Sequence, residues 1–189
     1  MTDPTFVNVG AEFVEFARGY QHTAYRLEVR DNYADPSEAE HVQKFVAGEP
    51  DDESWMEDWM GLVLRRTLEG RRIERVRVVS EPWSDYVRYG LHSARLNTAA
   101  GEDIRYLSRG RANELGLPTY DYWLLDSHKM CILRHDDQDV LLGADIIHDP
   151  AVILEHAYFR DVARRFAAPR AEYLSRYDDE FLSKSNINR

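Results

Sequence analysis

The chain has a single cysteine, Cys131, among its 189 residues. One thiol can form neither an intramolecular disulfide nor a zinc-binding cysteine cluster, and its place in the apolar run 130–133 is typical of a buried, unreactive side chain. Long apolar runs are missing too, since no segment approaches the roughly 18 apolar residues that a membrane span needs. Residues 1–4 lack the basic and apolar regions of a signal peptide. We therefore expect a soluble, cytoplasmic protein with no membrane contact.

Familiar catalytic signatures are also missing from the sequence. It contains no G-x-G-x-x-G or Walker A loop, no H-E-x-x-H helix and no G-x-S-x-G elbow. The seven histidines are scattered, and only His128 and His135 lie near each other, with aspartates around them. A hairpin there could hold a metal, but a solvated turn uses the same residue types, and we favour the turn. The sequence thus predicts no cofactor and no metal site.

Positive charge is scarce in the first third of the chain. Residues 1–60 hold 14 acidic and 4 basic side chains, which accounts for the whole formal charge of −10. Nucleic-acid affinity comes largely from neutralising phosphates, so direct nucleic-acid binding is disfavoured. A basic partner protein is not excluded by this charge, and the acidic third could be a docking surface.

What the sequence does contain is a regular alternation of helical and strand patterns. Apolar spacings of three and four residues predict helices over residues 10–18, 38–47, 53–69, 84–98 and 151–167, and residues 109–118 are expected to be a loop or a single helical turn. Alternating or continuous apolar runs predict strands over residues 23–29, 72–79, 103–107, 120–125, 130–133 and 140–147, the last three as an antiparallel meander.

These patterns predict an α+β fold with one central mixed or antiparallel sheet flanked by helices. The chain is close to the usual size of one domain, and it shows no repeat, linker or low-complexity tract. We expect one domain over residues 1–176, followed by a polar, flexible tail over residues 177–189.

The strongest candidate site begins on the strand over residues 72–79. Arg75 and Arg77 fall on its polar face, and burying two unpaired guanidinium groups is costly. They must therefore meet water, a carboxylate or an anionic ligand. Glu81 and Asp85 are the nearest carboxylates in sequence, and Tyr86 follows them. The segment indicates either a structural ion-pair network or a pocket for a polar or anionic ligand.

Further candidates lie outside that segment. Arg26 and Glu28 alternate on another predicted strand, where they form a solvated face, a cross-strand pair or part of the site. Glu102, Asp121 and Asp126 could supply acid–base chemistry together with Glu81 and Asp85, if burial shifts one pKa. An aromatic cage could be formed by Trp55, Trp59, Tyr122 and Trp123. Aromatic residues at this spacing more commonly belong to the core.

Several of these segments together resemble a family of actinobacterial proteins, number 6879 among the domains of unknown function. They are TAYRLE at 23–28, FVAGEP at 45–50, RVRVVSEPWSDY at 75–86, AGEDIR at 100–105, DYWLLD at 121–126 and Arg160-Asp161. The resemblance covers residues 13–169. It carries no activity over to this chain, but members of the family often look like neighbours of small helix-turn-helix regulators, which implies a regulatory accessory.

The second half also looks like half of a phospholipase D fold. That fold's H-x-K motif would need a lysine two residues after its histidine, whereas here Met130 stands two residues after His128. The catalytic motif is therefore absent.

The sequence leads to two functional hypotheses. The first is a non-catalytic regulatory domain that binds a partner protein or a small polar ligand through the region of Arg75, Arg77, Glu81 and Asp85. The alternative is an enzyme of specialised metabolism that uses an arginine–carboxylate pocket. A third possibility is a homodimer built by pairing of sheets or helices.

Overall fold

The computed structural model describes residues 3–177 together with Leu182 and Ile187. Within that part of the chain, eight strands form one mixed sheet in the order β1-β7-β6-β5-β2-β3-β4-β8. The strands are β1 (Thr5–Asn8), β2 (Thr23–Glu28), β3 (Arg72–Val79), β4 (Asp103–Ser108), β5 (Tyr122–Leu125), β6 (Lys129–His135), β7 (Leu141–Ile147) and β8 (Ala168–Pro169). This confirms the predicted α+β class with a single central sheet.

Parallel and antiparallel pairing divide the sheet into two parts. Strands β2, β3 and β4 are parallel neighbours, and the chain returns between them through helices. Strands β5, β6 and β7 form the predicted antiparallel meander, and β1 extends it at the edge. Strand β5 pairs antiparallel with β2 and so joins the two parts.

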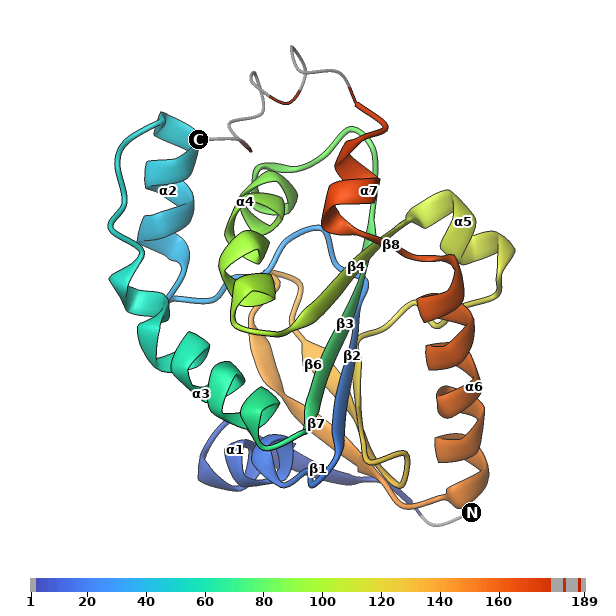
Figure 1. Ribbon diagram of the computed structural model, residues 1–189. Helices are drawn as coiled ribbons and strands as arrows, with labels where there is room; N and C mark the ends of the chain where they lie inside the picture. Colours follow the sequence, from blue (N-terminus) through green and yellow to red (C-terminus); the bar gives the residue numbers. More distant parts are fainter. Residues whose placement is uncertain (1–2, 178–181, 183–186, 188–189) are drawn as a thin grey trace.

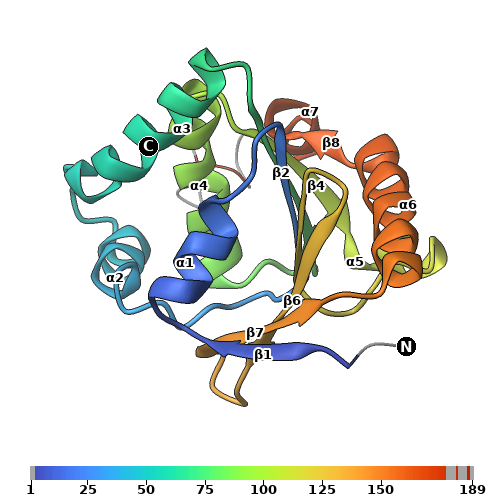
Figure 2. The same ribbon diagram turned by 90° about the horizontal axis from the view of Figure 1, so that it is seen from below.

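Helices cover both faces of the sheet (Figures 1 and 2). One face carries α1 (Ala11–Arg18), α2 (Ala39–Ala47), the single 3-10 turn η1 (Ser54–Met56), α3 (Glu57–Leu68) and α4 (Asp85–Ala99). The opposite face carries α5 (Arg109–Glu114) and α6 (Pro150–Phe166), while α7 (Arg170–Leu174) follows the short edge strand β8.

Local signals in the sequence set several helix boundaries. Ser84 caps α4 by accepting a hydrogen bond from the backbone N–H of Val87. Asp149 caps α6 in the same way, ahead of Pro150 in the first turn. Helix α2 ends at Gly48, whose φ of 71° is the left-handed conformation that glycine adopts most readily.

The two faces of β2 and β3 have different chemistry. Tyr25, Leu27, Val76 and Val78 are fully buried in the apolar core beneath α6. The alternate positions of the same strands carry charged side chains toward the face that α1 to α4 cover. The charged side chains between the sheet and the helices α1 to α4 are the feature that positions the candidate site.

Most predicted elements are confirmed within a few residues, and three short ones were missed. The missed elements are β1, β8 and α7. The flexible tail predicted from residue 177 falls mainly on residues outside those described; the described Leu182 and Ile187 are buried in the cluster beside α4 and α7. None of the described helices combines the length and apolarity needed to cross a bilayer.

Candidate functional site

A cavity of about 600 Å³ lies between the sheet and the helices α1, α3 and α4. Its floor is the charged face of β2 and β3, and its walls come from the helices and from the loop between β2 and α2. Pockets of this size accommodate small ligands, and pocket linings commonly combine apolar side chains with a few polar groups. We call this cavity the arginine pocket.

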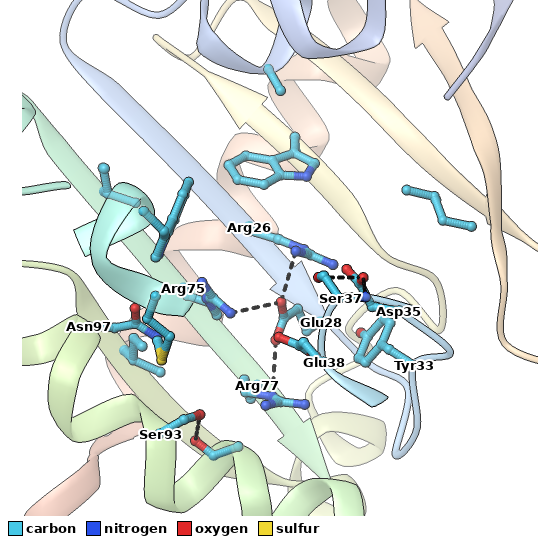
Figure 3. Close-up of a pocket in the computed structure, with 18 of the residues that line it drawn as sticks. Arg26, Glu28, Tyr33, Asp35, Ser37, Glu38, Arg75, Arg77, Ser93 and Asn97 are labelled. Carbon is cyan, nitrogen blue, oxygen red and sulfur yellow. Dashed lines mark hydrogen bonds and ion pairs between the residues drawn. The ribbon is translucent and has the colours of Figure 1, made fainter. Parts of the chain in front are cut away.

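Parallel register brings the charged residues of the floor together. Arg26 on β2 is opposite Arg75 on β3, and Glu28 is opposite Arg77. Because side chains two residues apart in a strand share a face, these four project to the same side of the sheet. The arginine cluster is therefore Arg26, Arg75 and Arg77, and Glu28 sits among them (Figure 3).

All three guanidinium groups contact the carboxylate of Glu28. Its Oε1 lies 3.1 Å from Nη1 of Arg26 and 3.2 Å from Nη1 of Arg75, and its Oε2 lies 3.0 Å from Nε of Arg77. Burial alone would raise the pKa of Glu28, but the three arginines outweigh it and lower that pKa to about 2. Glu28 is therefore a fixed negative charge and a weak base.

A second carboxylate, Glu102, binds the same cluster from the loop before β4. Its Oε1 accepts a hydrogen bond from Nε of Arg75 at 2.8 Å and lies 2.7 Å from Nη2. Burial raises the pKa of Glu102 above its ordinary value, because the one arginine beside it only partly offsets the loss of water. The pKa of Arg75 is raised as well, since the carboxylates of Glu102 and Glu28 outweigh the effect of its burial. The two short N–O contacts between Glu102 and Arg75 are those of a charged pair.

Asp121 anchors the loop that forms one wall of the pocket. It accepts hydrogen bonds from the backbone N–H of Val29 at 2.7 Å and from the hydroxyl of Tyr33 at 2.6 Å, and it lies 4.0 Å from Nη2 of Arg26. Farther along this wall, the Tyr86 hydroxyl donates to Glu38. The wall is thus held to the sheet by polar contacts and not by apolar packing alone.

Helix α4 can approach the arginine cluster because it has a glycine at the point of contact. A Cβ atom on Gly90 would lie 2.1 Å from Nη1 of Arg77. Arg77 is 6 % exposed, and its guanidinium lies over the rings of Tyr33 at 5.9 Å and Tyr86 at 5.6 Å. Gly90 is therefore a steric requirement of the site, although no sequence motif marks it.

Aromatic side chains line the part of the arginine pocket next to Arg26. Trp55, Trp59 and Trp123 line it and are only partly buried. The guanidinium of Arg26 lies 5.5 Å from the ring centroid of Trp123. A cage that includes Tyr122 is wrong, because Tyr122 points to the other face of the sheet and is fully buried against His156.

Five of the predicted site residues line this one cavity: Arg26, Glu28, Arg75, Arg77 and Tyr86. Glu102 and Asp121 lie behind them and contact the cluster without lining the cavity. Of the two histidines that lie near each other in the sequence, His135 lines the pocket beside Tyr33. His128 forms a hydrogen bond with the carbonyl of Asp126 at a turn.

The predicted partners of the arginines were wrong. Glu81 accepts a hydrogen bond from Tyr177, and Asp85 pairs with Arg88 one turn along α4. Both residues follow the end of β3, where the chain turns away from the sheet toward α4. The carboxylates that reach Arg75 and Arg77 are Glu28 on β2 and Glu102 in the loop before β4. Asp126 is also remote from the cavity, since it accepts backbone N–H groups from residues 21–23.

Three contributors were missed by sequence reasoning, namely Tyr33, Gly90 and Asn97. Asn97 is 7 % exposed and lines the cavity from α4, and its Oδ1 has no hydrogen-bond partner. The one available signal for Asn97 was its position two turns after Gly90, on the side of α4 where the other buried residues are apolar or glycine. A single asparagine in a helix is too common to indicate a site.

The fold and site together define an α+β protein that encloses a charge-balanced arginine pocket under one layer of helices. The chain belongs to the family described as a domain of unknown function (DUF6879), whose model matches residues 11–175. The match spans every strand of the pocket floor and the helices above it. A comparison with curated proteins gives no match.

Proposed function

We propose that the chain is a non-catalytic regulatory or accessory domain whose arginine pocket binds a small polar or anionic ligand. The observation that carries this proposal is an open cavity over a buried charged floor. Arg26 keeps 22 % of its side chain exposed there and Arg75 keeps 17 %, although both are ion-paired. A ligand entering the cavity would meet donors that are already held in place.

A purely structural ion-pair network explains the charges but not the cavity. Protein interiors are close-packed, and voids much larger than a water molecule are few. Replacing buried ion pairs by apolar side chains is often neutral or stabilising, so a buried network is weak evidence of a stabilising role. A cavity beside such a network is better explained by a ligand-binding role.

The enzyme hypothesis has less support from the geometry. None of the five carboxylates considered as its acid or base lines the arginine pocket: Glu81, Asp85, Glu102, Asp121 and Asp126. Three other carboxylates line the walls and already have partners, Asp35 with Ser37, Glu38 with Tyr86 and Asp139 with Arg30. Glu28 on the pocket floor has a lowered pKa and three arginine partners, which make it a poor proton acceptor. Binding is therefore the function that we favour.

The partner in this proposal is a helix-turn-helix regulator, as the family resemblance implies. Ligand binding in the pocket would then change the affinity of the domain for that regulator, with both proteins in the cytoplasm. The support is by analogy alone. Titration of the two purified proteins measures the complex with the regulator. Light scattering of the domain alone measures any homodimer.

Blocking the pocket without touching the arginine cluster tests ligand binding. Ser93 lines the cavity from α4 and is half-buried, whereas Thr98 on the same helix is exposed and does not line it. In a thermal-shift screen of small acids and amides, we expect compounds that raise the Tm of the wild type to lose that effect in S93F and to keep it in T98F.

The same screen contradicts the proposal if no compound stabilises the wild type. It also contradicts it if S93F, shown to be folded by circular dichroism, responds to the same compounds as T98F.

A further inference from the structure

We propose that the arginine pocket selects small aromatic acids that carry one carboxylate on a flat ring. This inference rests on the proposed function, because it names the class of ligand that the same cavity takes. Its support comes from the charge balance of the floor, from the unused donors of the arginine cluster and from the aromatic wall beside them.

The charge balance of the floor argues against highly charged ligands. The three guanidinium groups of the arginine cluster face three carboxylates, of which Glu28 and Glu102 are within 3.2 Å and Asp121 is at 4.0 Å. Local positive and negative charges therefore offset each other almost completely. A phosphate dianion would bring two further negative charges into a site without a surplus of positive charge, whereas a single carboxylate adds one.

Unused hydrogen-bond donors argue for an oxygen acceptor on the ligand. Each guanidinium has five N–H donors. Nε of Arg26 and Nη2 of Arg77 have no hydrogen-bond partner, but both atoms are buried, so a ligand would use the open parts of the cluster. Arg26 and Arg75 are the two members of the cluster with area open to the cavity. A carboxylate fits such planar donors in a two-point contact, which a neutral carbonyl matches less well.

The aromatic wall argues for a flat ring on that acid. Trp55, Trp59 and Trp123 line the pocket, and Trp123 lies directly beneath the guanidinium of Arg26. A ring packed along these indoles places a short carboxylate side arm near Arg26. Flat rings pack against aromatic side chains more closely than puckered ones, and they add offset-stacked or edge-to-face attraction.

Asn97 adds a polar contact on the side of α4. Its Oδ1 is buried without a partner in a side chain that lines the cavity, and such an atom costs free energy until a donor reaches it. A hydroxyl or amine on the ring could supply that donor, so a hydroxylated ring is expected to bind at least as well as a plain one.

Calorimetric titration with a matched series of probes tests the ligand class. Phenylacetate is the reference, phenylacetamide removes the charge, phenyl phosphate adds a second charge, cyclohexylacetate removes the flat ring, and acetate removes the ring altogether. We expect phenylacetate to bind at least about tenfold more tightly than phenylacetamide, with phenyl phosphate no tighter than phenylacetate and cyclohexylacetate several-fold weaker. Acetate should show no binding in the same range.

Two arginine variants assign that preference to the pocket. R26M removes one of the two cavity-facing guanidinium groups while Glu28 keeps Arg75 and Arg77, and it should reduce the preference for the acid over the amide several-fold. R134M is the matched control, because Arg134 is also a strand arginine paired with an aspartate, Asp145, but does not line the cavity. It should retain the wild-type preference.

The outcomes separate the ligand class from the proposed function. Equal affinity for acid and amide, or tighter binding of phenyl phosphate, overturns the class. If no probe binds while a screened compound stabilises the wild type and not S93F, the class is wrong and the binding function stands. If neither the probes nor any screened compound binds, both proposals fail.

Discussion

Glu28 is the residue on which the charged floor depends. It is 3 % exposed and contacts all three members of the arginine cluster, so its loss leaves buried positive charge without its shared partner. Removing one member of a buried pair is far more costly than removing an exposed one. The site therefore concentrates its stability in one carboxylate while keeping the arginines oriented toward the cavity.

We expect E28Q to lower the free energy of unfolding by about 3 kcal/mol or more, as is typical for breaking a buried ion pair. The matched control is E114Q, which removes an exposed carboxylate 2.7 Å from Arg111 on α5 and should cost about 0–1 kcal/mol. Urea denaturation of both variants measures the difference. Equal losses would mean that the arginine cluster does not depend on Glu28.

The cost of E28Q should also depend on pH. The pKa of Glu28 falls from 4.5 to about 2 on folding, so its charge stabilises the folded state above the unfolded pKa, and that contribution is lost as the pH falls toward the folded pKa. The gap between wild type and E28Q should therefore narrow between about pH 5 and pH 2. A gap that stays constant over that window would contradict the assigned role of Glu28.

At the scale of elements, the contact between α4 and β3 decides how closely the helix can cover the sheet. We expect G90A to be destabilising by about 1–3 kcal/mol, because its Cβ would lie 2.1 Å from Arg77 and push the guanidinium away from Glu28. This outweighs the gain of up to about 1 kcal/mol that alanine normally brings to a helix.

The control for that change is G61A on α3, where a Cβ would lie 3.4 Å from the flexible end of Arg65. It should be neutral or stabilising. Combining G90A with R77M should remove most of the cost of G90A, which a double-mutant cycle measures. An undiminished cost in the R77M background would show that Arg77 is not the obstacle.

The elements also show which parts of the fold and site the sequence can predict. Long amphipathic helices such as α3 and α6 are recognisable because their apolar period continues over several turns. The alternation of charged and apolar residues on β2 and β3 also shows correctly that Arg75 and Arg77 share a face. Strands β1 and β8 have four and two residues, and they are strands only because β7 and β4 lie beside them.

Pairing between distant segments could not be predicted in the same way. Glu28 and Arg77 are opposite each other because β2 and β3 run parallel in a particular register. Nearness along the chain suggested Glu81 and Asp85 instead, and the chain turns both away from the sheet. The repeated pattern of charged, apolar, charged at 26–28 and 75–77 was the one available signal, since matching patterns favour adjacent strands.

At the scale of the whole molecule, the two faces of the sheet differ in chemistry. The face beneath α6 is an apolar core, and the opposite face carries the arginine pocket beneath α1, α3 and α4. The acidic excess of residues 1–60 lies mainly on α1, on α2, on the loop between β2 and α2 and on the segment leading into α3, all on the pocket side. The proposed anionic ligand would therefore be held by the local cluster and would not be attracted by the overall charge.

Crystals of the protein soaked with a fragment library that includes aromatic acids provide the most direct test of the pocket. We expect fragment density along the tryptophan side of the pocket, with a carboxylate at the exposed edges of Arg26 and Arg75 and with Glu28 still in contact with its three arginines. Fragments that bind only elsewhere on the surface, or a pocket closed by its own side chains, would contradict it.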